Sequence, residues 1–286
     1  MIIRLKYLLC FMLCALNIYA QDRVSITVWV HGTYPALKWL AHKRSPFRSW
    51  VYAPMGLSLA KELDKDYYFY QLAYDCYARD SIAYDVDHFY LFGWYSSNMR
   101  PGRRKKEGKK LQKELDALLN TYHKTYKQVD LRLVGVSHGG NVLLNCIDTM
   151  PSYEYVTTEL ILLATPIQES TRVYVNRAPV DKVYSFYSNN DWMQRIDAQK
   201  FHHDSPKKSP FWSSRTFKPD DRVTQVHVKV NNKDIGHGKY RSIAGRLPDM
   251  MKEVKQKEQA IEKQQPVKVE HKQLDPSKHV DLNIKI

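Results

Sequence analysis

Ser137 lies in the segment Leu133–Gly140, where an apolar run ends in Gly-Val-Ser-His-Gly. A serine between two glycines, directly after a predicted strand, is typical of the sharp strand-to-helix turn that lifts a nucleophilic hydroxyl above a parallel sheet. Glycine suits both flanking positions because the backbone approaches itself closely there. Only 11 of the 286 residues are glycine, so this spacing is a specific signal. We expect Ser137 to be a nucleophile; the alternative is a serine that merely caps a helix.

A nucleophilic serine needs a base, and His237 has the position that such folds give it. It follows the predicted strand Val223–Val230 and stands between Gly236 and Gly238. We expect these two glycines to allow a tight loop that points the imidazole back over the sheet edge. His227 fits less well because it alternates with valines and so lies on a strand face.

The base needs a carboxylate that orients it, and Asp191 is the first candidate. It follows the predicted strand Val183–Tyr187 through a Ser-Asn-Asn turn. An acid just past the carboxyl end of a strand can reach the imidazole nitrogen that the serine does not use. Asp197, six residues further on, is the alternative. Asn-Asn-Asp is also ordinary turn chemistry, so the choice between the two stays open.

The developing oxyanion needs backbone N–H donors. One should come from the residue after the nucleophile, His138, and one from the loop after the first core strand, at Thr33. Gly32 would allow the close approach that presents the next N–H, and His31 would support the same loop. This set of groups performs acyl transfer without a metal or a cofactor, and we expect neither.

Alternating strands and helices must position these residues. Strands are predicted at residues 24–30, 88–94, 129–136, 159–164, 183–187 and 223–230, and helices at 106–126 and 139–150. This order predicts the α/β class, with a mainly parallel central sheet and helices on both faces. Residues 21–250 should form one domain. Residues 251–286 are rich in charge, and we expect a tail that is partly helical and otherwise disordered or loosely attached.

Residues 1–20 read as a secretory signal, with Arg4 and Lys6 before an apolar stretch that is too short to span a bilayer. This predicts a secreted or periplasmic protein; the alternative is an uncleaved membrane anchor. Only Cys76 and Cys146 follow this segment. They could pair in an oxidising compartment, but two buried free thiols are the favoured interpretation.

The formal net charge is +14, and its densest cluster of basic residues lies just before and within the first predicted helix. The cluster consists of Arg100, Arg103, Arg104, Lys105, Lys106, Lys109 and Lys110. Such a surface could contact anionic lipid headgroups or simply be a solvated face. Nucleic acid is not expected as a partner, because no binding motif for it is present.

These motifs occur in the order and rough spacing of the α/β-hydrolase superfamily, which the chain resembles over about residues 24–250. The residues that carry the resemblance are Val30–Thr33, Gly135–Gly139, Asp191 and Ile235–His237. Leu91–Tyr95 and Leu162–Pro166 look like the lipase-like branch. The resemblance implies a trimmed form of the eight-stranded fold and hydrolysis of esters or related acyl compounds without a metal.

Two aromatic-bearing connections flank the expected site, one from Tyr34 to Met55 and one from Trp192 to Asp221. Either could line an acyl pocket or form a lid, or could be ordinary core packing. The sequence therefore predicts an exported serine hydrolase that cleaves carboxylic esters, including small-molecule or lipid esters. The alternatives are an acyltransferase or thioesterase with the same triad, and a non-catalytic hydrolase fold that binds an envelope partner.

Overall fold

The computed structural model describes residues 22–33, 53–97, 100–197, 212–264 and 278–286. Its strands are β1 (Arg23–Val30), β2 (Gly56–Leu59), β3 (Phe89–Gly93), β4 (Gln128–Val136), β5 (Val156–Leu163), β6 (Lys182–Tyr187), β7 (Val223–Val230), β8 (Lys233–Asp234) and β9 (Lys278–Ile284). Its α-helices are α3 (Tyr68–Arg79), α4 (Pro101–His123), α5 (His138–Ile147), α6 (Lys239–Ile243) and α7 (Leu247–Gln264).

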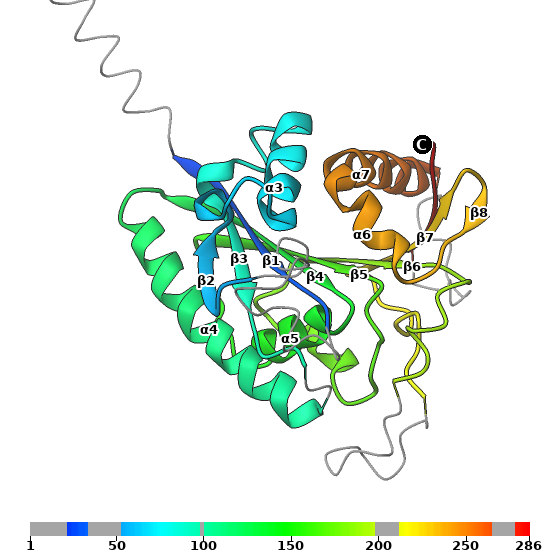
Figure 1. Ribbon diagram of the computed structural model, residues 1–286, viewed down its shortest axis with the longest axis horizontal. Coiled ribbons are helices and arrows are strands. Elements are labelled where there is room, and N and C mark those ends of the chain that lie inside the picture. The colour runs from blue at the N-terminus through cyan, green and yellow to red at the C-terminus, as the bar shows by residue number, and fades with distance from the viewer. Residues whose placement is uncertain (1–21, 34–52, 98–99, 198–211, 265–277) are drawn as a thin grey trace, which may run out of the picture.

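Within the described residues, these strands form one sheet in the order β2-β3-β1-β4-β5-β6-β7-β8, with β9 added to β7 (Figure 1). The pairs from β3 through β1, β4, β5 and β6 to β7 are all parallel, and so is the pair of β7 with β9. Only β2 and β8 pair antiparallel with their neighbours. The carboxyl ends of the central strands therefore meet at one edge, where ligands bind in open α/β sheets.

Helices cover both faces of this sheet, α4 and α5 on one and α3, α6 and α7 on the other (Figure 1). Side chains of each strand alternate between the two cores. On β4, for example, Leu131 and Leu133 pack in the core with α4 and α5, whereas Val134 packs in the core with α3 and α7. The predicted fold class, α/β with a mainly parallel sheet covered on both faces, is confirmed.

Each of the six predicted strands is present, with boundaries that differ by up to three residues. The helix predicted over 106–126 begins earlier, at Pro101, because proline suits the first turn of a helix, where its missing N–H costs nothing. Helix α3 and the short strand β2 were not predicted.

The C-terminal segment differs from the loosely attached tail that the composition predicts. Helix α7 extends to Gln264, and β9 pairs in parallel with β7 along Thr224–Val230. Val280, Leu282 and Ile284 of β9 are buried in the core with α7. Their period-two spacing is the signal that composition alone obscured, because alternation marks a strand with one buried face even in a charged segment.

Glu258 of α7 ties this C-terminal helix to the sheet. Its carboxylate accepts hydrogen bonds from Thr224 Oγ1 at 2.8 Å, from Tyr184 Oη at 3.1 Å and from Lys182 Nζ. Burial by itself would raise the pKa of Glu258, but the bonds from Lys182 and Thr224 outweigh it and lower that pKa below its usual value of 4.5. A carboxylate held ionised in this way stabilises the fold.

Replacing Glu258 by glutamine is expected to lower the free energy of unfolding by about 1–3 kcal/mol at neutral pH, because buried donors lose a charged acceptor. The stabilisation is complete above pH 4.5 and is lost as the pH falls through the lower pKa of the folded state. The gap between wild type and variant should therefore close in acid. Urea unfolding at several pH values measures this. Glu253→Gln, on the exposed side of α7, should change little; equal effects of the two variants would contradict the prediction.

Cys76 and Cys146 are both free and buried, so the alternative that they pair does not hold. Burial raises the pKa of the Cys76 thiol to about 12. No helix among the described parts of the chain is both long enough and apolar enough to cross a bilayer. The predicted signal at residues 1–20 lies outside the described residues.

Candidate active site

Ser137 occupies the turn between β4 and α5, as predicted. Its φ of 52° is positive, which is a conformation that residues with a side chain rarely adopt and that clusters at functional sites. Two backbone hydrogen bonds hold the turn: the Ser137 amide donates to Leu163 on β5 at 2.8 Å, and the Gly140 amide donates to the Ser137 carbonyl at 3.0 Å. The hydroxyl therefore stands at the carboxyl end of a central strand.

Glycines beside Ser137 are required because the backbone is crowded. A Cβ on Gly135 would collide with the backbone of Gly140, and a Cβ on Gly139 would collide with the carbonyl of Val30 on β1. Both obstacles are main-chain atoms of the sheet and of α5, so they cannot move aside cheaply. The close approach that the Gly-x-Ser-x-Gly spacing predicts is present at both positions.

The two glycines beside His237 are not in a crowded part of the backbone. A Cβ on Gly236 or Gly238 would meet nothing within 4 Å. Gly238 has a φ of −65°, which any residue adopts. Neither position therefore requires glycine for steric reasons, and the loop brings His237 to Ser137.

Replacing Gly139 by alanine should lower stability by about 1–3 kcal/mol or more, since a methyl group would overlap the backbone of β1. Gly238→Ala, the matched change in open space, should stay within about 0.5 kcal/mol of wild type. Thermal unfolding of the two variants measures the difference. A wild-type midpoint for Gly139→Ala would show that the turn is not crowded as described.

The structure brings Ser137, His237 and Asp191 together from three distant parts of the chain. His237 Nε2 lies 2.9 Å from Ser137 Oγ. On the other side of the ring, Nδ1 lies 2.9 Å from Asp191 Oδ2 and 3.1 Å from Oδ1. Asp191 is fully buried, whereas about a quarter of the His237 side chain is exposed. These contacts form a continuous hydrogen-bonded series from hydroxyl to imidazole to carboxylate.

The loop that carries Asp191 is itself fixed by hydrogen bonds. The Asp191 amide donates to Ser188 at 3.1 Å, and the Gln194 amide donates to Asp191 Oδ1 at 3.2 Å. Arg215 Nε donates to the backbone carbonyl of Asp191 at 3.0 Å. Ser188 Oγ also accepts from the amide of Ile235, two residues before His237, at 2.8 Å. Asp191 and His237 are therefore positioned against each other by contacts that their two loops share.

Asp197, the alternative acid, pairs with a different group. Its Oδ2 lies 3.5 Å from Nη2 of Arg104 on α4 and also accepts a hydrogen bond from Gln168. The Arg104 side chain is fully buried, and burial lowers its pKa while Asp197 opposes that shift. Arg104 thus belongs to the basic cluster that was predicted to lie on the surface, but its own side chain is buried. Nothing in the local sequence distinguishes it from the lysines that follow it.

Arg104 also fixes His138, the residue after Ser137. Nη1 of Arg104 lies 2.9 Å from His138 Nδ1. A guanidinium only donates hydrogen bonds, so Nδ1 must be the acceptor. Asn141 Nδ2, one turn along α5, lies 3.5 Å from the same atom and donates to the carbonyl of Pro166 at 3.0 Å. This buried polar network fastens the first turn of α5, where the expected oxyanion donor His138 N–H lies.

The second expected oxyanion donor, Thr33, follows Gly32 on the loop after β1. A Cβ on Gly32 would lie 3.1 Å from Ser137 Cβ, so this loop passes directly beside Ser137. His31 is buried, its Nδ1 lies 2.8 Å from the Gly32 carbonyl, and burial lowers its pKa to about 4. At neutral pH it is therefore an uncharged support of the loop, with Nδ1–H as the donor.

Within the described part of the chain, no three His, Cys, Asp or Glu side chains gather where they could hold a metal ion. Residues 34–52 and 198–211, which make up much of the two aromatic-bearing connections, lie outside the described residues. Met55 and Trp212 are described, and both are exposed.

Comparison with known proteins adds little to this geometry. No protein-family model matches the chain, and no curated protein matches it. Among solved structures, it is similar to the product of the gene lin2722 from Listeria innocua, with 14% sequence identity and a TM-score of 0.37. That similarity covers 90% of this chain and 99% of the other.

Proposed function

We propose that this protein is a serine hydrolase that cleaves carboxylic esters through a covalent acyl-enzyme. The observation that carries the proposal is the placement of His237 between Ser137 and Asp191, with a 2.9 Å contact on each side. A nucleophile in contact with a base that a third group orients is the arrangement that activates serine for acyl transfer.

In this proposal, His237 Nε2 accepts the proton of Ser137 Oγ as the oxygen attacks the ester carbonyl. Asp191 accepts the Nδ1–H bond, which keeps Nε2 free of hydrogen in the resting state and stabilises the imidazolium that forms. The N–H groups of Thr33 and His138 stabilise the oxyanion. His237 then protonates the departing alcohol, and water, activated by the same imidazole, releases the acid.

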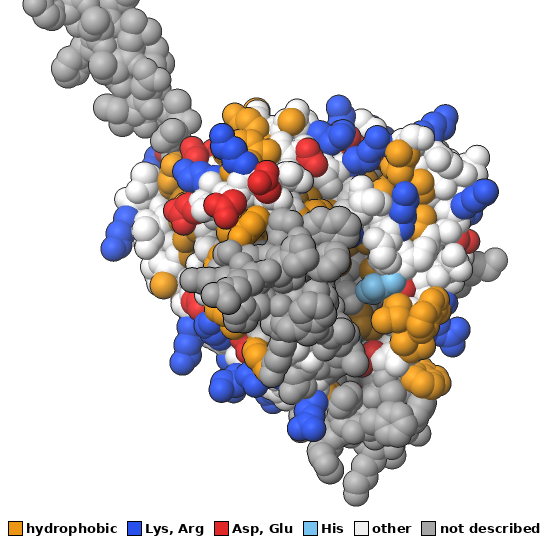
Figure 2. Space-filling model, in the orientation of Figure 1, with side chains coloured by type: hydrophobic (Ala, Val, Ile, Leu, Met, Phe, Trp, Pro, Cys, Tyr) orange, Lys and Arg blue, Asp and Glu red, His pale blue; other side chains and the backbone are white. Residues whose placement is uncertain are grey.

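Exposed apolar surface near the acid loop supports an ester with an apolar acyl group. Trp192, Met193, Ile196 and Trp212 each expose between 39% and 61% of their surface. On the face shown in Figure 2, exposed hydrophobic side chains gather beside a histidine side chain. The resemblance of the motifs to the lipase-like branch of the α/β-hydrolases supports the same substrate class. The leader-like residues 1–20 support export to the periplasm or the medium.

Turnover of nitrophenyl esters of increasing acyl length tests the proposal, together with labelling by a fluorophosphonate probe. We expect release of the free acid and a single probe adduct on the Ser137 peptide, read by mass spectrometry. Product analysis in the presence of alcohols separates hydrolysis from acyl transfer. Failure of every ester to turn over, with no adduct on Ser137, would refute the proposal.

A further inference from the structure

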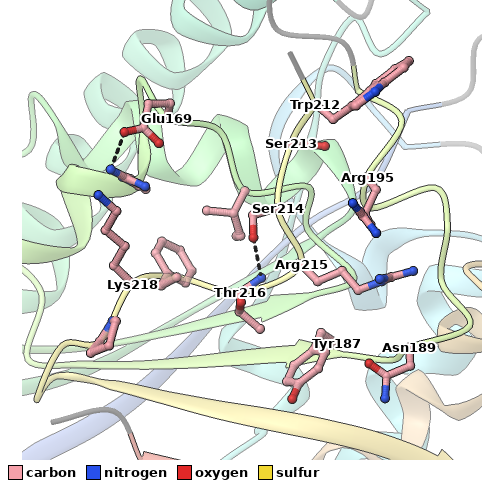
Figure 3. A pocket seen from close by; sticks show the side chains of 14 residues that line it. Glu169, Tyr187, Asn189, Arg195, Trp212, Ser213, Ser214, Arg215, Thr216 and Lys218 are labelled. Atoms are coloured by element: carbon pink, nitrogen blue, oxygen red, sulfur yellow. Dashed lines mark hydrogen bonds and ion pairs between the residues drawn. The ribbon is translucent and has the colours of Figure 1, made fainter. Parts of the chain in front are cut away.

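A cavity of about 800 Å³ lies beside the acid loop, at the carboxyl ends of β5 and β6 (Figure 3). Three segments line it: one after β5, one after β6 that continues past Asp191, and one before β7. Its volume falls in the range of small-molecule sites, which is about 300–1,000 Å³. None of the steps proposed for Ser137 uses it.

Positive charge dominates the described lining. Four cationic side chains, Arg172, Arg195, Arg215 and Lys218, face one carboxylate, Glu169. Glu169 pairs with Arg172. In Figure 3, Glu169 and Lys218 lie at one end of the cavity, and the side chains of Arg195 and Arg215 extend toward the opposite end. Among the described residues, no carboxylate forms an ion pair with Arg195 or Arg215.

Hydrogen bonds hold the backbone at the Arg195 and Arg215 end, and they hold Nε of Arg215 as well. Arg215 is anchored through Nε to the carbonyl of Asp191 at 3.0 Å, while its terminal nitrogens make no hydrogen bond to a described residue. Arg195 closes a turn, its amide donating to the Trp192 carbonyl at 2.9 Å. Ser213 Oγ donates to the Gln194 carbonyl at 2.6 Å, which joins the two segments. Because Nε of Arg215 is already anchored, this donor has a reduced ordering cost on binding.

Two further polar side chains lie at the same end of the cavity, and one of them, Asn189, already contacts His227 Nε2 through its Nδ2 at 3.1 Å. Tyr187 and Asn189 lie there beside Arg215 (Figure 3). Burial and then the carboxylates Asp281 and Asp234 raise the pKa of the Tyr187 hydroxyl, so it remains a donor at neutral pH. Because no described carboxylate forms an ion pair with Arg195 or Arg215, their charges can attract an anion that enters the cavity. Guanidinium forks match the oxygen geometry of phosphate.

We propose that this cavity binds a phosphate group through Arg195 and Arg215. The phosphate is carried either by the ester substrate or by a separate small molecule. Binding itself does not depend on the proposed hydrolase function; only the version in which the substrate carries the phosphate rests on it.

Calorimetric titration of inorganic phosphate into the Ser137→Ala protein tests binding without turnover. Arg195→Gln in that background should weaken phosphate binding by about tenfold or more, because one charge-assisted contact is lost. Arg195→Glu should abolish it, since the change replaces an attractive charge by a carboxylate that repels the anion. Lys105→Gln, which removes one charge from the exposed surface of α4, is the matched control and should bind as the parent does. No phosphate binding by the parent, or equal binding by the parent and both Arg195 variants, would overturn the proposal.

Kinetics of otherwise wild-type protein then identify the source of the phosphate. Butyryl glycerol and butyryl glycerol phosphate differ only in that group. If the substrate carries it, Arg195→Gln raises KM about tenfold for the phosphorylated ester alone, and inorganic phosphate competes with that ester. If a separate molecule carries it, the variant loses calorimetric binding while the ratio of the two KM values stays unchanged. Absence of any ester turnover would count against the hydrolase function and leave the calorimetric test intact.

Discussion

Replacing Ser137 by alanine should lower kcat toward short acyl esters by about 10⁴- to 10⁶-fold, the range observed when a serine nucleophile is removed. The reason is that Oγ, 2.9 Å from His237 Nε2, is the atom proposed to attack the carbonyl. Labelling by a fluorophosphonate should disappear as well, because the probe forms its bond with the same oxygen. Initial rates on nitrophenyl butyrate and intact-mass measurement after labelling give the two results.

Ser152→Ala serves as the control, because Ser152 is exposed in the loop between α5 and β5. It should keep wild-type turnover and labelling. The Ser137 variant should unfold at a temperature close to wild type, since only one oxygen is removed. Turnover retained by folded Ser137→Ala protein would show that the nucleophile lies elsewhere.

Asp191→Asn should lower kcat by about 10⁴-fold while leaving the protein folded. An asparagine amide can fill the space of the carboxylate but cannot stabilise the imidazolium, and it allows the wrong tautomer of His237. In the wild-type protein, Asp191 Oδ2 lies 2.9 Å from His237 Nδ1. Steady-state kinetics at several pH values measure the loss and show whether any residual activity needs a more alkaline solution.

Asp197→Asn is the matched variant, and its expected effect is of another kind. Asp197 partners the fully buried Arg104, so the change leaves a buried charge uncompensated and should cost about 3–5 kcal/mol of stability. The folded fraction should keep far more activity per molecule than Asp191→Asn. If Asp197→Asn stays stable and loses activity as severely as Asp191→Asn, the assignment of Asp191 as the orienting acid fails.

Ser137 and His237, the proposed nucleophile and base, could be predicted together with the fold class because the signals are local. The turn at Ser137 has no room for a side chain at Gly135 or Gly139, and the structure shows the backbone atoms that a Cβ would meet at each position. Alternating and continuous apolar runs report strands by the same kind of local rule. The glycines beside His237 meet no such steric requirement, since a Cβ on Gly236 or Gly238 would have no atom within 4 Å.

Composition predicted the structure less well than residue spacing did, as the C-terminal segment and the basic cluster show. The C-terminal segment contains a buried strand, β9, because alternating apolar residues bury one face whatever the charges between them. Within the basic cluster, Arg104 is buried while Lys105 and Lys106 are exposed. Both outcomes depend on which face of a helix or strand packs against the core. Composition counts all residues of a segment together and so does not distinguish its two faces.

The sequence alone determined the strand-turn-helix geometry at Ser137 and the alternation of strands and helices, since both follow from sterics and periodicity over a few residues. Only the tertiary structure decided that Asp191 contacts His237 while Asp197 contacts Arg104. The two acids lie six residues apart on one connection, and local rules treat them alike. Long-range packing separates them, because the loop after β6 turns one carboxylate toward His237 and the other toward a buried guanidinium on α4.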